Sequence, residues 1–195
     1  AKHTSNPNHT GLDIVQVKGS GNIDMYAAIP GTVTKVITGC VQGTYSCGSG
    51  YGNQVAITYD FGAGKKTQPK SNGVTYTIKK VTVFYGHLYS VNVKQGDVID
   101  TTCSNKSNCH TMDTPIGKMG TTGSSTGIHS HFEVRVEATG SDGWSTAKSP
   151  SPRCGSCVFV DPTPWITTGW NGSPSIKLVP LANDILKTMT NKPPI

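Results

Sequence analysis

Residues 129–138 alternate between polar and apolar side chains, with Ser130 as the one departure, and this pattern constrains the fold more than any other feature of the chain. A period of two residues is typical of a β-strand with one buried face. The two faces have opposite character, with Phe132, Val134 and Val136 on one and His129, His131, Glu133, Arg135 and Glu137 on the other. We therefore expect a strand whose apolar face covers a core and whose other face carries a row of ionisable groups.

Further β-strand patterns precede this segment. The runs at residues 32–38, 53–60 and 76–87 are rich in β-branched and aromatic residues, and residues 91–99 contain a tight-turn signal at Gln95-Gly96-Asp97 between two short strands. Polar, glycine-rich stretches at residues 39–50, 62–73 and 101–114 are typical of surface loops. Helical spacing occurs only near the end, at Leu181, Ile185, Leu186 and Met189.

Length and composition favour one all-β domain. The chain has 195 residues, with 23 glycines and 12 prolines, which argues against a helical bundle and for short strands joined by turns. No internal repeat or linker divides it, so we interpret residues 1–195 as a single domain.

The charge of the chain leaves two classes of partner open. A formal net charge of +6 suits a nucleic acid or an anionic cell-wall polymer equally well. Lysines gather in the middle of the chain, in a pattern typical of a solvated loop or, as the alternative, of a contact patch for an anionic wall polymer: Lys65, Lys66, Lys70, Lys79 and Lys80. Few aromatic residues lie among them, so nucleic-acid binding is not expected. No apolar run is long enough to cross a bilayer, so no membrane contact is expected either.

The six cysteines form three close pairs in turn-like segments. An even number in such segments favours disulfides and an oxidising location, although six cysteines allow about 15 connectivities. Local pairing is the simplest hypothesis, with these pairs: Cys40 with Cys47, Cys103 with Cys109, and Cys154 with Cys157. The C-x-x-C spacing of the last pair would also fit a redox or zinc-knuckle site, but its proline-rich surroundings do not fit a helix start.

Histidines provide the candidate functional residues. His129 and His131 leave the same face of the expected strand, so they can begin a metal site or simply be two hydrogen-bonded histidines. His9 and Asp13 offer an imidazole and a carboxylate four residues apart, which could equally belong to an ordinary turn. His87 ends another expected strand. Each feature alone is weak evidence for a site.

Residues 120–127 form a glycine-rich segment directly before the alternating strand. Its glycines permit a tight turn into that strand. A phosphate-binding loop is the rival interpretation, but it requires a following helix and a Gly-Lys-Ser/Thr ending, and this sequence has neither.

Taken in order along the chain, these motifs resemble those of the lysostaphin/LytM-type zinc metallo-endopeptidases, which cut peptides in bacterial peptidoglycan. The resemblance spans residues 9 to about 162, and residues 163–195 form a C-terminal extension without a counterpart. The matching pieces include His9-x-Gly11-Leu12-Asp13, Tyr51-Gly52-Asn53, Tyr85-Gly86-His87-Leu88, Ser125-Thr126-Gly127-x-His129-x-His131-Phe132-Glu133-Val134 and Val160-Asp161-Pro162.

The resemblance implies a role for five residues. It makes His9, Asp13 and His131 the ligands of one zinc ion, and it makes His87 and His129 catalytic histidines that do not bind the metal. Spacing alone would not choose between His129 and His131 as the ligand. Three protein ligands leave a fourth position open for water, which is typical of catalytic rather than structural zinc. His3 and His110 match no position of the site.

The sequence thus predicts an all-β fold with a large antiparallel sheet, in which loops wall a narrow groove for an extended peptide. The implied function is hydrolysis of a peptide bond in the stem or cross-bridge of peptidoglycan, by a monomeric domain outside the cell or facing the wall. That domain could be a secreted hydrolase or part of a phage or conjugation machine.

The alternative is an inactive family member that binds the wall as a scaffold or regulator, although such members are expected to lose ligands. The loops that carry the first four cysteines are expected to lie away from the ligands.

Overall fold

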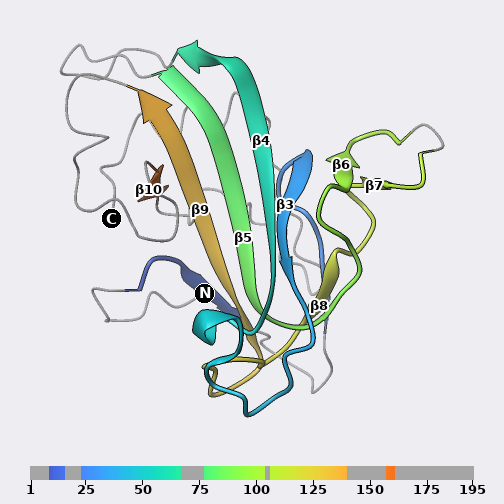
Figure 1. Cartoon of the computed structure of the whole chain (residues 1–195), viewed down its shortest axis with the longest axis vertical. Helices are drawn as coiled ribbons and strands as arrows, with labels where there is room; N and C mark the ends of the chain where they lie inside the picture. Colours follow the sequence, from blue (N-terminus) through green and yellow to red (C-terminus); the bar gives the residue numbers. More distant parts are fainter. Residues whose placement is uncertain (1–8, 16–22, 67–76, 104–105, 140–156, 161–195) are drawn as a thin grey trace.

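The computed structural model describes residues 9–15, 23–66, 77–103, 106–139 and 157–160 (Figure 1). Within these ranges the secondary structure is almost entirely β. Ten strands and one short 3₁₀ helix, η1 (Cys47–Gly50), make up the regular structure. The all-β expectation is therefore confirmed.

Three long strands form the centre of the sheet and run side by side in Figure 1: β4 (Asn53–Lys66), β5 (Thr77–Val91) and β9 (His129–Thr139). The sheet order is β1-β9-β5-β4-β3-β6-β7, in which β1 spans Leu12–Val15, β3 Gly31–Ile37, β6 Val98–Asp100 and β7 Cys109–Thr111. Off this path, β10 (Cys157–Val160) pairs with β9, and β8 (Gly117–Met119) pairs with β5 and with β2 (Asp24–Met25).

The sheet is mostly antiparallel, as expected, but it is mixed. All pairings are antiparallel except that between β6 and β7, which is parallel. The turn expected at residues 95–97 forms, yet its flanking strands do not pair with each other, because β6 joins β3 and β7. Turn residues determine where the chain reverses, whereas the partner of a three-residue strand depends on tertiary packing.

Two of the expected loops contain strand instead. Residues 62–66 continue β4, because they pair with the start of β5 after a register shift between Asp60 and Lys65. Residues 109–111 form β7 within the stretch expected to be a loop. Residues 39–50 do form an irregular loop that ends in η1. A polar, turn-like composition therefore does not exclude strand pairing, and residues 109–111 are partly buried in β7.

The core covers one face of the sheet. Alternate residues of the long strands point into it, as the period of two predicts for Phe132, Val134 and Val136, all 0% exposed. Segments 25–29 and 116–119 contribute to the same apolar cluster: Met25, Ala27, Ala28, Ile29, Ile116 and Met119. The opposite face of β9 carries the ionisable row, so burial of the apolar face fixes which side His129 and His131 take.

Two of the predicted disulfides are present. Cys40 pairs with Cys47 and Cys103 pairs with Cys109, at sequence separations of 7 and 6 residues. In the third predicted pair, Cys154 lies outside the described residues, and Cys157 is disulfide-bonded. None of the described cysteines is free.

Other predictions also fall outside the described residues. These are the helical spacing at residues 181–189, the extension 163–195, His3 and Lys70. Among the residues that are described, no helix has the length and apolar character that a membrane span requires.

Candidate metal centre

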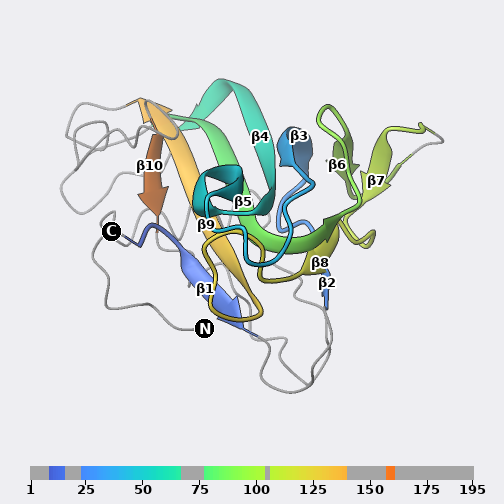
Figure 2. The same ribbon diagram turned by 60° about the horizontal axis from the view of Figure 1, so that its bottom comes forward.

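Strand β1 lies antiparallel beside β9 at one edge of the sheet (Figure 2). The register pairs Asp13 with His131, so the carboxylate and the imidazole leave the same face of neighbouring strands. His9 stands in the segment just before β1 and reaches the same point, with its ring edge-on to that of His131 at a centroid distance of 4.6 Å. The structure therefore brings the three expected ligands together.

Three potential ligand atoms converge in a small triangle. Asp13 Oδ1 lies 3.0 Å from His9 Nε2 and 3.3 Å from His131 Nδ1, and the two imidazole nitrogens are 3.1 Å apart. No other His/Cys/Asp/Glu group of this kind occurs among the described residues. A tetrahedral zinc site with bonds of about 2.0–2.1 Å has ligand–ligand edges of about 3.3 Å, so the triangle needs only a slight expansion to hold the ion.

The chemistry of the triangle also suits a cation. The second nitrogen of His131, Nε2, lies 2.8 Å from a Glu133 oxygen, and because a carboxylate only accepts, Nε2 carries the proton. A neutral His131 therefore presents a lone pair on Nδ1, opposite the negative oxygen of Asp13. Two acceptors 3.3 Å apart are satisfied only by a cation between them or by an extra proton. The residues present thus fit zinc.

The pKa values of this pair reflect the same electrostatics in the metal-free chain. Burial lowers the pKa of His131, but hydrogen bonds and charge from Asp13 and Glu133 outweigh it and raise the pKa above its usual value. Burial raises the pKa of Asp13, yet the hydrogen bond with His131 and the nearby His9 and His129 lower it overall. A proton and a metal ion would therefore compete for Nδ1 of His131, and metal binding would weaken as pH falls.

Gly11 allows the segment that carries the expected ligand His9 to approach β9 closely. A Cβ atom at this position would lie 2.5 Å from the carbonyl oxygen of Phe132 and 2.9 Å from His131 Nε2. Real Cβ atoms are not found so near a backbone oxygen. The glycine between His9 and Asp13 is thus required by close packing, which gives the motif a structural reason beyond a turn.

A buried carboxylate lies behind the three expected ligands. Glu133 is 0% exposed and accepts hydrogen bonds from His131, Thr10 and Arg135. Burial raises the pKa of Glu133, but the hydrogen bond from His131 and the charge of Arg135 dominate and lower it to about 2. The carboxylate is therefore charged at every pH at which His131 can be neutral.

His129 faces the triangle without joining it. Its Nδ1 lies 2.8 Å from the carbonyl oxygen of Gly127 and 3.2 Å from Ser125 Oγ. Because the carbonyl only accepts, Nδ1 carries the proton and neutral His129 has its lone pair on Nε2. That Nε2 is 3.8 Å from Asp13 Oδ1, a longer distance than any edge of the triangle.

His87 is held from the other side of the cleft. It is 6% exposed, its backbone N–H donates to the Tyr51 carbonyl oxygen at 2.7 Å, and its Nδ1 lies 2.7 Å from the Thr122 carbonyl oxygen. Its φ of 59° is left-handed, which is unusual for a residue other than glycine and is found at functional sites. Burial lowers the pKa of His87 to about 4, against the opposing hydrogen bond to Thr122.

These groups line one open cleft of about 360 Å³. The imidazoles of His87 and His129 are 4.7 Å apart between ring centroids, and the Tyr51 ring lies stacked near His87 at 6.2 Å. Two loops complete the walls with Ser49, Gly50, Ser124, Ser125 and Thr126. All five predicted site residues therefore lie in a single cleft.

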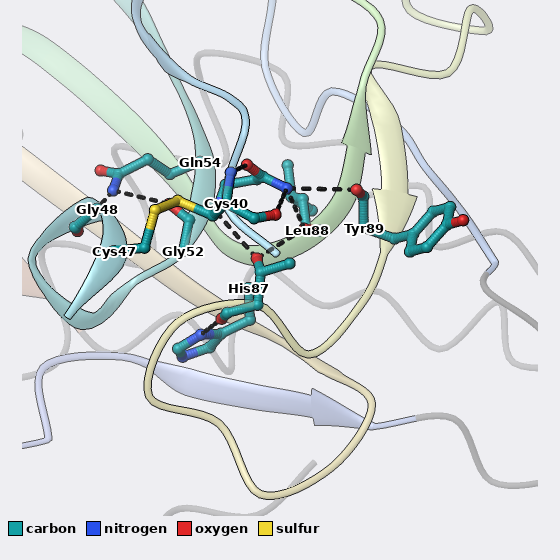
Figure 3. Close-up of a disulfide and its surroundings, with 10 residues drawn as sticks. Cys40, Cys47, Gly48, Gly52, Gln54, His87, Leu88 and Tyr89 are labelled. Carbon is teal, nitrogen blue, oxygen red and sulfur yellow. Dashed lines mark hydrogen bonds between the residues drawn. A yellow bond between two sulfur atoms is a disulfide. The ribbon is translucent and has the colours of Figure 1, made fainter. Parts of the chain in front are cut away.

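One disulfide loop is part of this cleft, contrary to expectation. Figure 3 shows the Cys40–Cys47 bridge close to the end of β5 that carries His87. The Asn53 side chain accepts from Cys40 N–H and donates to the carbonyl oxygens of Cys40 and Leu88. Gly52 N–H donates to the Cys47 carbonyl oxygen. The loop at residues 39–50 thus packs against the backbone that positions His87.

Some contributors to the site had no assigned role in the sequence. Thr122 and Gly127 act through backbone carbonyl oxygens, and Thr10 acts through a hydroxyl group in a turn. Such residues are common in loops, so no pattern marks them. The sequence placed Glu133 on the ionisable face of β9, but it did not show that this carboxylate is fully buried. His110, which matches no site position, bonds instead to the carboxylate of Asp97 at 2.9 Å.

Comparison with known proteins gives structural similarity only. No family model matches the chain, and neither does any curated protein sequence. The catalytic domain of a mutant of the prophage-encoded M23 protein EnpA from Enterococcus faecalis is 18% identical, with a TM-score of 0.43 over 84% of this chain and 82% of that one. The antimicrobial peptidase lysostaphin from Staphylococcus simulans is 22% identical, with a TM-score of 0.43 over 90% of this chain. The match covers 49% of the lysostaphin chain, about half of its length.

A third solved structure, that of LytU, is 22% identical, with a TM-score of 0.38 over 68% of this chain and 66% of that one. Lysostaphin gives its name to the family whose motifs the sequence resembles.

Proposed function

We propose that this protein is a zinc-dependent endopeptidase of the lysostaphin/LytM type, with His9, Asp13 and His131 as the ligands. The observation that carries the proposal is the triangle of ligand atoms with edges of 3.0–3.3 Å, with two further histidines beside it. When bound there, a zinc ion would supply Lewis-acid polarisation of the scissile carbonyl and acidify a water molecule.

The two remaining histidines suit proton transfer. Each donates from Nδ1 to a backbone carbonyl oxygen, Thr122 for His87 and Gly127 for His129, so neutral Nε2 of each can accept a proton. From this cleft, one imidazole can take the proton of the attacking water and return it to the leaving amine. The other, when it also carries a proton on Nε2, can donate a hydrogen bond to the developing oxyanion. The pKa of His87, lowered to about 4 by burial, keeps its Nε2 unprotonated at neutral pH.

The substrate class follows from the sequence resemblance and fits the open cleft. A cleft that is open at the surface can take an extended peptide between its two loop walls. We propose a peptide bond in the stem or cross-bridge of bacterial peptidoglycan, and a location outside the cell or facing the wall. The two disulfide bridges are in keeping with an oxidising compartment.

Digestion of defined muropeptides, followed by mass spectrometry of the new termini, tests this function. We expect cleavage of one type of peptide bond, about one zinc per chain, and loss of cleavage when a chelator removes the metal. The matched control is His110→Ala, because that histidine bonds Asp97 outside the cleft. It should retain both zinc and cleavage. A zinc-loaded protein that binds wall but releases no new termini would overturn the proposal in favour of an inactive wall-binding role.

A further inference from the structure

The sequence motif that contains His131 also contains Glu133, to which neither the ligand set nor the proton transfer assigns a task. This carboxylate lies two residues beyond His131 on the same face of β9 and is 0% exposed. A charged group is buried this completely only where specific partners compensate its desolvation. The identity of those partners indicates what the residue does.

The two oxygens of Glu133 have separate partners. Oε2 accepts from Arg135 through Nε at 2.8 Å and through Nη2. The guanidinium group of Arg135 also lies over the Phe84 ring, 4.7 Å from its centroid, which restrains its position. Oε1 instead lies on the side of the proposed metal site. The arginine thus anchors one oxygen and orients the other.

Oε1 is shared by both segments that carry ligands. It accepts from His131 Nε2–H at 2.8 Å and from the Thr10 hydroxyl at 2.5 Å. Thr10 directly follows His9 in the chain, whereas His131 is more than 120 residues away. One buried oxygen therefore joins the turn before β1 to the ligand strand β9, at the place where Gly11 lets the two backbones touch.

We propose that Glu133 is a positioning residue for the metal centre, and that Thr10 and Arg135 hold it in place. Its Oε1 keeps the proton of His131 on Nε2, which leaves the Nδ1 lone pair directed at His9 and Asp13. Through Thr10, the same oxygen holds His9 against His131. Partners of this kind typically change metal affinity by about 10–100-fold when removed. The proposal rests on the proposed ligand set.

Zinc affinity measured by competition with a chelator tests the role without any assay of cleavage. Glu133→Gln should raise the zinc dissociation constant by about 10–100-fold. Glu137→Gln, on the same face of the same strand but four residues further from His131, is the matched control and should bind zinc as the unaltered protein does.

Thr10 provides a second test that leaves the buried charge untouched, should Glu133→Gln fail to fold. Thr10→Val keeps the branched shape and removes only the hydroxyl, so it should weaken zinc binding. Thr10→Ser keeps the hydroxyl and should restore the affinity. A merely structural role would not follow the hydroxyl group in this way. Equal affinity for Thr10→Val and Thr10→Ser, with Glu133→Gln also unchanged if it folds, would overturn the proposal.

Nitrogen NMR of the metal-free protein reads the tautomer directly. At a pH at which His131 is neutral, we expect its proton on Nε2 in the unaltered chain and a mixture of tautomers in Glu133→Gln. A proton on Nδ1 in the unaltered chain would contradict the positioning role. The proposed function fails separately, if His131→Ala retains full zinc, so the two failures are distinguishable.

Discussion

The two halves of the cleft are built differently. On the ligand side, His131 is oriented by side chains, through a hydrogen bond to the buried carboxylate of Glu133 and a register that places it opposite Asp13. On the other side, His87 and His129 are oriented by backbone carbonyl oxygens of one loop, at Thr122 and Gly127. In the proposed function, metal binding would therefore depend on strand register and buried charge, whereas proton transfer would depend on loop geometry.

The largest effect should come from breaking the ligand side. Loss of His131 or Asp13 leaves two protein ligands, which hold zinc poorly. His131→Ala and Asp13→Ala should each lose the metal, and their activity should fall by more than the ~10²–10⁴-fold typical of a lost acid–base group. Metal analysis of the purified variants, alongside muropeptide digestion, measures both. Full zinc occupancy in His131→Ala would show that the ligand set is wrong.

The next largest effect should come from His87 and His129, whose rings are held by backbone carbonyl oxygens of the loop at residues 120–127. His87→Ala should keep near-normal zinc and lose ~10²–10⁴-fold in kcat, because its imidazole contacts the reaction and not the metal. The double variant of His87 and His129 should lose less than the product of the two single losses, since both act on one transition state. Fully multiplicative losses would mean that the two histidines act in independent steps.

The two disulfides allow a test of whether the loop at residues 39–50 supports catalysis rather than metal binding. Replacing Cys40 and Cys47 by serine frees the loop that contacts the backbone beside His87, so kcat should fall by roughly 10–100-fold while zinc content stays near one per chain. The control is the same replacement of Cys103 and Cys109, whose bridge lies by β6 and β7 at the opposite edge of the sheet from β1. Equal loss of activity in the two double variants would show that the Cys40–Cys47 loop has no special role.

The smallest effect concerns pH. The pKa of His87 is lowered to about 4 by burial, against about 6.5 in an unfolded chain, so the folded state binds this proton more weakly. The contribution to stability is therefore full above about pH 6.5 and is lost as pH falls toward 4. NMR titration of the metal-free protein should find the ring neutral at pH 5.5. A ring that titrates near 6.5 would contradict the burial argument.

The sequence predicted the fold where strands are long and one-sided. The alternation at residues 129–138 located β9 and both of its faces, and the core confirms it. It did not predict β2, of two residues, or β7, of three, because such short strands form only where a neighbour offers a free edge. The extension of β4 past Asp60 depends on a register shift against β5, which no local pattern encodes.

For the candidate site, the sequence showed which residue types are present but not which groups each side chain contacts. His129 and His131 have the same side chain and leave the same strand face, so periodicity cannot separate them. The two histidines differ in the groups that lie within hydrogen-bond distance of Nδ1. For His131 these include the nitrogen of His9 and the carboxylate of Asp13, and for His129 the carbonyl oxygen of Gly127. Contacts across 118 or 122 positions of the chain, or to a backbone carbonyl, leave no trace in local sequence.

The difference between His129 and His131 also provides the most direct test of the proposed division of the cleft. The measurement is the zinc content of His129→Ala, determined by elemental analysis beside the unaltered protein and His131→Ala. The loop-held position of His129 predicts about one zinc per chain, with cleavage lost, whereas His131→Ala should hold almost none. Release of the metal from His129→Ala would make His129 a ligand and would contradict the division of the cleft into a metal-binding side and a proton-transfer side.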